Sequence, residues 1–194
     1  MNKEKSPLVI AIAAVSGGGK TTITKHLNQR FAHSTILSFD DYDFDGPHDF
    51  VDWIDHGGNL NEWNLTPLVK DIESKLTEPL EYIFLDFPFS YKHAQVSKFI
   101  DFSIFIDTPL DIALARRIRR DFADSSTLSI INDMEMYLTG GRRAYLHMLN
   151  TIKPNADMIV DGTLQVTEMT NVIYETLKSI HRNNALKRKN SSFM

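Results

Sequence analysis

The sequence predicts an α/β protein with a mainly parallel sheet of five strands and helices on both faces. Two observations predict this class. Short apolar runs alternate with segments of helix length along the chain. The first run, residues 8–15, is continuously apolar, as expected for a strand buried on both faces of a parallel sheet. Parallel strands need crossover connections, and helical crossovers cover both faces of the sheet.

The individual elements follow from the same pattern. The β-favouring runs lie at 8–15, 35–39, 82–86, 102–107 and 158–161. The segments of helix length lie at 21–31, 67–77, 109–122, 128–152 and 166–181. Pro67 and Pro109 each stand in the first turn of a predicted helix, where the missing N–H of proline is tolerated. The pair Gly140-Gly141 predicts a break in the fourth helix.

Composition narrows the class of protein. A chain of 194 residues with 42% hydrophobic and 24% charged residues is typical of one globular domain. The net charge of −4 argues against a protein that grips nucleic acid through its phosphates. The absence of cysteine excludes thiolate nucleophiles and cysteine-ligated metal sites, and it fits the cytoplasm. No apolar run approaches the roughly 20 residues of a membrane span, so we expect neither a nucleic-acid nor a membrane partner.

We expect one domain over residues 1–182 and a flexible basic tail over residues 183–194. The tail carries Lys187, Arg188 and Lys189. Such ends are usually solvated, and binding of an acidic partner is the alternative.

A glycine-rich segment links the first strand to the first helix, which is the context of a P-loop. Small residues let successive N–H groups point into one concavity, and the helix N-terminus adds donors. Lys20 can then reach the outer phosphates of a nucleotide, and the Thr21 hydroxyl can ligate Mg²⁺. Ala14 stands where the usual pattern has its first glycine, so we expect a loop that needs no positive φ there. The expected nucleotide-binding residues are Ser16, Gly17, Gly18, Gly19, Lys20, Thr21 and Thr22.

Three candidate site aspartates are Asp40, Asp86 and Asp107, which end or follow predicted strands, where ligands bind in such folds. Asp40 follows the second strand, where it can accept a proton from an attacking hydroxyl or bind Mg²⁺. Helix capping or loop solvation is the alternative for Asp40. Asp86 ends the third strand and suits a ligand of Mg²⁺ or its water. Asp107 is followed by Thr108-Pro109, so we expect a turn or capping role for it.

Several segments resemble the uridine kinase and phosphoribulokinase family of P-loop kinases, and the phosphate loop is the most specific of them. ILSFDDY at 36–42 looks like the family's second strand with its catalytic aspartate. FDGPHDF at 44–50 resembles its Phe-Asp-x-Pro-x-x-Phe acceptor-side segment. ARRIRRD at 115–121 is similar to its arginine-rich lid helix, and PNADMIVD at 154–161 to the stretch that leads into its last strand.

The resemblance implies the three-layer P-loop NTPase fold and an ATP- and Mg²⁺-dependent kinase that phosphorylates a hydroxyl of a small nucleoside-like molecule. It implies Asp40 as the general base. Arg116 and Arg120, four residues apart and therefore on one helix face, would close from a lid around residues 116–127. Surface ion pairs are the alternative for each arginine. Related kinases often self-associate, so a homo-oligomer is a further expectation.

The same resemblance assigns the remaining site residues. The catalytic groups would be Asp40, Lys20, Arg116 and Arg120. The metal ligands would be Thr21, Asp40 and Asp86, with Asp86 in the place where many uridine kinases have glutamate. The acceptor would contact Asp40, Tyr42, Phe44 and Asp45. The sequence after Asp86 reads FPFSY instead of the familiar Glu-Gly, which leaves the acceptor open.

The stretch 31–69 bears on the acceptor because it holds no lysine or arginine but seven aspartates and several aromatic residues. If this stretch lines the acceptor pocket, its field is negative and disfavours a sugar phosphate. We therefore expect a neutral or cationic acceptor with a stackable ring. Nicotinamide riboside or another vitamin or sugar is the alternative acceptor. An ATPase or a regulatory nucleotide-binding protein is the alternative of another class.

Overall fold

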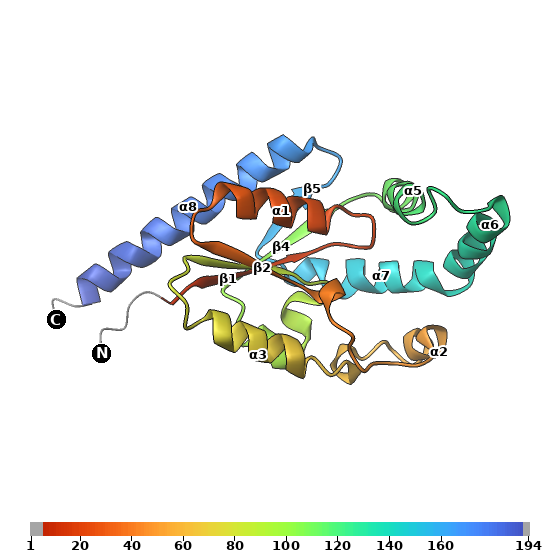
Figure 1. Ribbon diagram of the computed structural model, residues 1–194, viewed down its shortest axis with the longest axis horizontal. Helices are drawn as coiled ribbons and strands as arrows, with labels where there is room; N and C mark the ends of the chain where they lie inside the picture. The colour runs from red at the N-terminus through yellow and green to blue at the C-terminus, as the bar shows by residue number, and fades with distance from the viewer. Residues whose placement is uncertain (1–5, 192–194) are drawn as a thin grey trace.

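The computed structural model describes residues 6–191, without the side chains of residues 50, 51 and 183–191. Its centre is a five-stranded sheet in the order β2-β3-β1-β4-β5, in which every neighbouring pair is parallel (Figure 1). The strands are β1 (Leu8–Ala13), β2 (Ser34–Ser38), β3 (Tyr82–Asp86), β4 (Phe102–Asp107) and β5 (Met158–Asp161). The predicted α/β fold is confirmed.

Helices cover both faces of the sheet (Figure 1). They are α1 (Lys20–Arg30), α2 (Phe50–Asp55), α3 (Thr66–Lys75), α4 (Ala94–Ser97), α5 (Leu110–Asp121), α6 (Thr127–Met136), α7 (Arg142–Thr151) and α8 (Val166–Ser191). Helices α1 and α8 lie on one face, and α3 lies on the other. The short helices α2 and α4 are absent from the sequence prediction. Helix α8 continues to Ser191, into the segment from residue 183 that the sequence predicts to be a tail.

The core consists of two apolar layers because the central strand β1 is buried on both faces. Leu8, Ile10 and Ile12 pack toward α1 and α8. Val9 and Ala11 pack on the opposite face, with apolar residues of α3. The alternation of strand side chains between two faces accounts for this division. The strand ends that carry the predicted site are therefore anchored by a rigid core.

The helical conformation is not interrupted at Gly140-Gly141, so the sequence prediction of a helix break there is wrong. Residues Tyr137–Gly141 form one π-helical turn between α6 and α7. Gly141 keeps helical backbone angles (φ −57°, ψ −38°), so its conformational freedom is not used. A π turn accommodates an extra residue without ending a helix, and it changes the direction in which the following residues face. The turn thus determines which side of α7 meets the rest of the protein.

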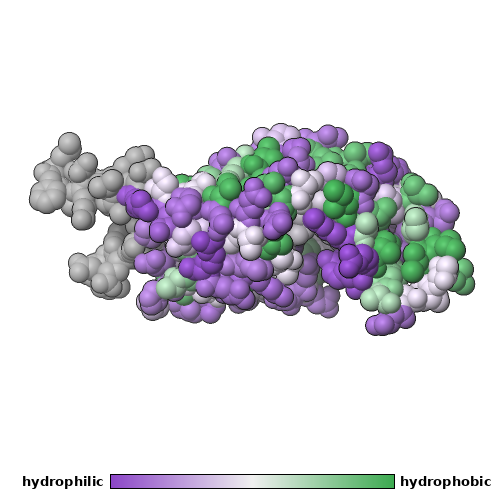
Figure 2. All heavy atoms as spheres, turned by 90° about the horizontal axis from the view of Figure 1, so that it is seen from above, coloured by the Kyte–Doolittle hydropathy of each residue, from purple (hydrophilic) through white to green (hydrophobic). Residues whose placement is uncertain are grey.

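Helix α6 projects from the domain and is tied to α5 by one ion pair. The Arg117 guanidinium donates two hydrogen bonds to the Asp133 carboxylate, at 3.0 and 2.5 Å. Figure 2 shows apolar side chains gathering at the end of the molecule where α6 lies. Leu128, Met136 and Leu138 are among the exposed residues there. Among the residues that the structure describes, no helix has the length and apolar character to cross a membrane.

Candidate functional site

The loop after β1 forms a concave turn that its neighbours hold in place. Gly17 (φ 79°) and Gly19 (φ 100°) adopt left-handed conformations that favour glycine. A Cβ atom on Gly17 would lie 2.0 Å from the carbonyl oxygen of Ala113, because α5 passes directly against the loop. The Thr108 hydroxyl donates a hydrogen bond of 2.9 Å to the Gly18 carbonyl. The loop is therefore fixed by α5 and by the residue that follows β4.

Ala14 occupies the place of the usual first glycine without backbone strain. Among the described non-glycine residues, only His33 and Ser90 have positive φ. Ala14 therefore has no positive φ, as the sequence predicts. A Cβ atom on Gly18 would lie 2.8 Å from the Ala14 methyl group. The methyl group of Ala14 therefore takes the space that a side chain at position 18 would need.

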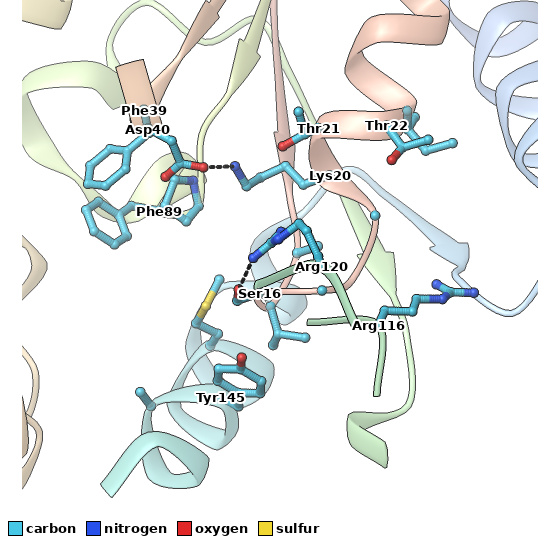
Figure 3. Close-up of a pocket in the computed structure, with 18 of the residues that line it drawn as sticks. Ser16, Lys20, Thr21, Thr22, Phe39, Asp40, Phe89, Arg116, Arg120 and Tyr145 are labelled. Carbon is cyan, nitrogen blue, oxygen red and sulfur yellow. Dashed lines mark hydrogen bonds and ion pairs between the residues drawn. The ribbon is translucent and has the colours of Figure 1, made fainter. Parts of the chain in front are cut away.

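Lys20 opens α1 and directs its ammonium group toward two carboxylates at strand ends. Its Nζ forms an ion pair with Oδ1 of Asp86. The same Nζ lies 3.7 Å from Oδ2 of Asp40 (Figure 3). The strand register accounts for this meeting, because Asp86 lies opposite Ile12 of β1 and Ser38 of β2. The three predicted residues from three separate elements thus lie together at one edge of the sheet.

The two carboxylates have contrasting surroundings. The Asp86 side chain is 1% exposed, and among the described residues its Oδ2 has no hydrogen-bond partner. The Asp40 side chain is 72% exposed. A buried carboxylate oxygen without a partner is costly, and a hydrated cation would supply that partner. The hydroxyl of Thr21 and the carboxylates of Asp40 and Asp86 are hard oxygen donors of the type that Mg²⁺ prefers, so these residues fit magnesium.

The two predicted lid arginines point in different directions (Figure 3). Arg120 donates to the Ser16 hydroxyl at 3.4 Å, which places its guanidinium beside the phosphate loop. Arg120 also hydrogen-bonds its neighbour Asp121 and thereby lowers the pKa of that carboxyl. Arg116 donates to the carbonyl oxygen of Gly162 at 3.2 Å and points away from Arg120. Only Arg120 is directed at the loop in this conformation.

A cavity of about 840 Å³ joins these groups. We call one part of it the loop side, which is lined by Ser16, Gly17, Gly19, Lys20, Thr21, Thr22, Ile23, Arg116, Arg120, Leu164, Val166 and Met169. We call the other part the aromatic side, which is lined by Phe39, Asp40, Trp53, Ile54, Leu60, Pro88, Phe89, Ala144, Tyr145, His147 and Met148. Of the predicted nucleotide-binding residues, Gly18 alone is buried behind the loop and lies outside the cavity lining.

Three predicted acceptor residues lie outside the cavity lining. The Tyr42 hydroxyl donates to Asp71 of α3 at 2.7 Å, and its ring stacks on Phe44. The Asp45 carbonyl accepts a hydrogen bond of 2.9 Å from the Asn64 amide. Segment 42–45 is thus occupied in packing against α3 and the chain before it.

Of the seven aspartates in the stretch 31–69, Asp40 is the one that lines the cavity. Asp40 lines the cavity, whereas Asp41, Asp43, Asp49 and Asp52 are exposed residues outside its lining. The condition of a pocket lined by many carboxylates is therefore not met. The remaining surface next to Asp40 is formed by the residues of the aromatic side.

A sequence model of the family described as Phosphoribulokinase / Uridine kinase matches residues 59–170. The chain belongs to this family. The uridine kinase of Borreliella burgdorferi is 24% identical over 198 residues, covering 90% of this chain and 96% of that protein. The uridine kinase of Bacillus velezensis is 26% identical over 213 residues, covering 94% of this chain and 99% of that protein. The protein is therefore a P-loop kinase, a phosphotransferase with a small-molecule substrate.

Solved structures of kinases share the fold of this family member. A gluconokinase from Sinorhizobium meliloti superimposes with a TM-score of 0.55 at 13% identity, over 95% of this chain and 99% of that one. A sugar kinase from Janibacter gives a TM-score of 0.56 at 13% identity, over 89% of this chain and 95% of that one. Similarity at this level of identity supports the fold.

In this P-loop kinase, the residues that sequence reasoning missed come from the helices of the aromatic side. Trp53 lines the cavity from α2, while Tyr145, His147 and Met148 line it from α7. On α7, Tyr145 and Met148 are three residues apart and share a face, and His147 shares a neighbouring face with Ala144, three residues before it. Burial raises the pKa of Tyr145, which lies among Ser16 and the arginines of α5. The periodicity of 142–151 marks an amphipathic helix, but no signal in the sequence says which cavity its face lines.

Proposed function

We propose that this kinase transfers the γ-phosphate of ATP, with Mg²⁺, to a hydroxyl group of a small nucleoside-like acceptor. The position of Asp40 carries the proposal. Its carboxylate lies 3.7 Å from Lys20 Nζ and lines the cavity between the loop side and the aromatic side. A general base for phosphoryl transfer needs the donor phosphate on one side and the acceptor hydroxyl on the other.

The loop side would hold the nucleotide. The loop N–H groups and the N-terminus of α1 form an anion site. Lys20 and Arg120 supply positive charge near the transferring group, where preorganised charge contributes strongly to catalysis. Leu164, Val166 and Met169 offer apolar contacts for the adenine base.

Thr21 and Asp86 would hold the metal. A bound Mg²⁺ neutralises charge on phosphate oxygens during transfer. The ion pair between Lys20 and Asp86 keeps the lysine at the end of β3, close to the loop. Asp40 is the more exposed carboxylate and makes the longer contact with Lys20, so it is available to take the acceptor proton.

The aromatic side would hold the acceptor. Among the described residues that line the cavity, the lysine and arginines are Lys20, Arg116 and Arg120, and all belong to the loop side. A phosphate group already present on the acceptor would meet no lysine or arginine among the described residues of the aromatic side. The proposal therefore retains a neutral or cationic acceptor.

The test is ADP formation from Mg·ATP in the presence and absence of uridine, nicotinamide riboside, gluconate or ribulose 5-phosphate. The proposal predicts that uridine or nicotinamide riboside stimulates ADP formation and yields its phosphate ester. Equal ADP formation without any acceptor would identify an ATPase. Preference for ribulose 5-phosphate would contradict the charge argument. Chelation of Mg²⁺ should abolish the acceptor-dependent rate.

A further inference from the structure

The aromatic side carries very few polar groups for its size. Phe39, Trp53, Ile54, Leu60, Phe89 and Met148 present apolar or aromatic surface to it. The indole N–H of Trp53 already donates to the Asn59 carbonyl at 3.1 Å, so this group is occupied. A ligand in this space therefore meets carbon surface except at a few defined points.

Those points are Asp40, Tyr145 and His147, and they differ in location. Asp40 lies beside Lys20, where the reacting hydroxyl must be. Tyr145 interacts with Ser16 and with the arginines of α5, which places its hydroxyl toward the loop side. His147 is the polar group that remains for the rest of the acceptor.

The turn that follows α2 lies close to the His147 ring. A Cβ atom on Gly58 would lie 3.6 Å from both Cε1 and Nε2 of His147, and 3.3 Å from Cδ1 of Ile54. The Gly58 amide donates to the Trp53 carbonyl at 2.9 Å, which fixes this turn beside the ring. Among the described side chains, none hydrogen-bonds the His147 imidazole. The ring thus lies beside this turn in the cavity lining, and its nitrogens are free to bind a ligand.

We propose that His147 hydrogen-bonds the polar edge of the acceptor's ring and so determines which acceptors this kinase uses. The inference rests on the proposed function and adds a specificity-determining residue to it. A planar ring with one polar edge would satisfy the single imidazole and bury its faces against the aromatic rings. A polyol would leave hydroxyl groups unpaired against the apolar wall, which is costly.

The test compares His147→Ala, His147→Gln and a control, His26→Ala, whose side chain is exposed on α1. The KM and kcat values are measured for uridine, nicotinamide riboside and gluconate with Mg·ATP. We expect His147→Ala to raise the KM of the ring acceptor by about tenfold with little change in kcat. His147→Gln, which retains a hydrogen-bonding group, should recover part of that loss. The KM of Mg·ATP should stay unchanged in all three variants.

Several outcomes would overturn the inference. One is an unchanged acceptor KM in a folded His147→Ala protein, with folding verified by its melting temperature. Another is an equal rise in the KM of Mg·ATP, which would indicate a general structural role. Gluconate as the preferred acceptor of the unmodified protein would also overturn it, while leaving a hydroxyl kinase intact. Acceptor-independent ADP formation would instead overturn the proposed function, and the inference with it.

Discussion

The loop side and the aromatic side of the cavity are built in different ways. The loop side is built mainly on one continuous stretch, 16–23, anchored between a buried strand and α5, with further residues from α5 and from residues 164–169. The aromatic side is assembled from α2, α7 and the ends of β2 and β3, which are far apart in the sequence. One side is held by the sheet, whereas the other depends largely on how two helices outside the sheet pack.

The contacts that hold the two sides in place also differ in strength. On the loop side, Gly17 lies so close to the Ala113 carbonyl that no side chain fits. On the aromatic side, an ion pair between Arg143 of α7 and Asp55 of α2 joins the two helices. Both of its side chains are roughly half exposed, so solvent screens the pair. The proposed phosphate site is therefore firmly held, and the proposed acceptor site has room to vary.

The largest effect in this comparison is expected from Lys20→Met on the loop side. Removing the ammonium group deletes a charge aimed at the transferring phosphate, so kcat should fall by about 10²–10³-fold. The control is Lys25→Met, an exposed lysine on the same helix. Steady-state kinetics with Mg·ATP checks the result. A decrease of less than threefold would show that the loop side does not carry the chemistry.

Asp86→Asn should give the next largest effect, through the metal. The substitution preserves shape but removes the charge of a buried carboxylate whose Oδ2 lacks a partner among the described residues. We expect the Mg²⁺ concentration for half-maximal activity to rise by about 10–100-fold. Asp111→Asn, at an exposed residue of α5, serves as the control. An unchanged Mg²⁺ titration would remove Asp86 from the metal site.

Arg143→Ala should have the smallest effect and would sharpen the comparison. The exposed pair with Asp55 should contribute no more than about 0.5 kcal/mol to the free energy of unfolding. We expect a shift in acceptor KM of about twofold, because a weak pair positions α2 and α7 only loosely. Arg142→Ala, the exposed neighbour, is the matched control. A large loss of stability would mean that the aromatic side is as firmly fixed as the loop side.

The fold was predictable where local pattern determines structure. The strands at 82–86, 102–107 and 158–161 have the predicted bounds, because their apolar runs are short and sharply ended. The prediction failed at Gly140-Gly141, where the local turn signal competes with tertiary packing and a π turn results. Helix α2 was missed because its few residues, among aspartates and glycines, carry no clear period.

The same difference between local pattern and tertiary packing applies to the candidate site. Lys20 and Asp86 lie together because a contiguous loop and the strand register leave little choice. Tyr42 and Phe44 follow the same strand as Asp40, but contacts with each other and with Asp71 hold them outside the cavity lining. His147 belongs to a helix whose position depends on the packing of the whole domain. A single sequence does not encode that position in any local pattern.

We propose that Asp40 takes the acceptor proton where the loop side and the aromatic side of the cavity meet. The most direct test is Asp40→Asn, assayed for acceptor-dependent ADP formation and, separately, for ATP binding. Asp41→Asn, at the exposed neighbour outside the cavity lining, is the matched control. The account predicts ATP affinity within about threefold of the unmodified protein and a loss of turnover of about 10²–10⁴-fold. Turnover that persists in Asp40→Asn at the level of Asp41→Asn would contradict it.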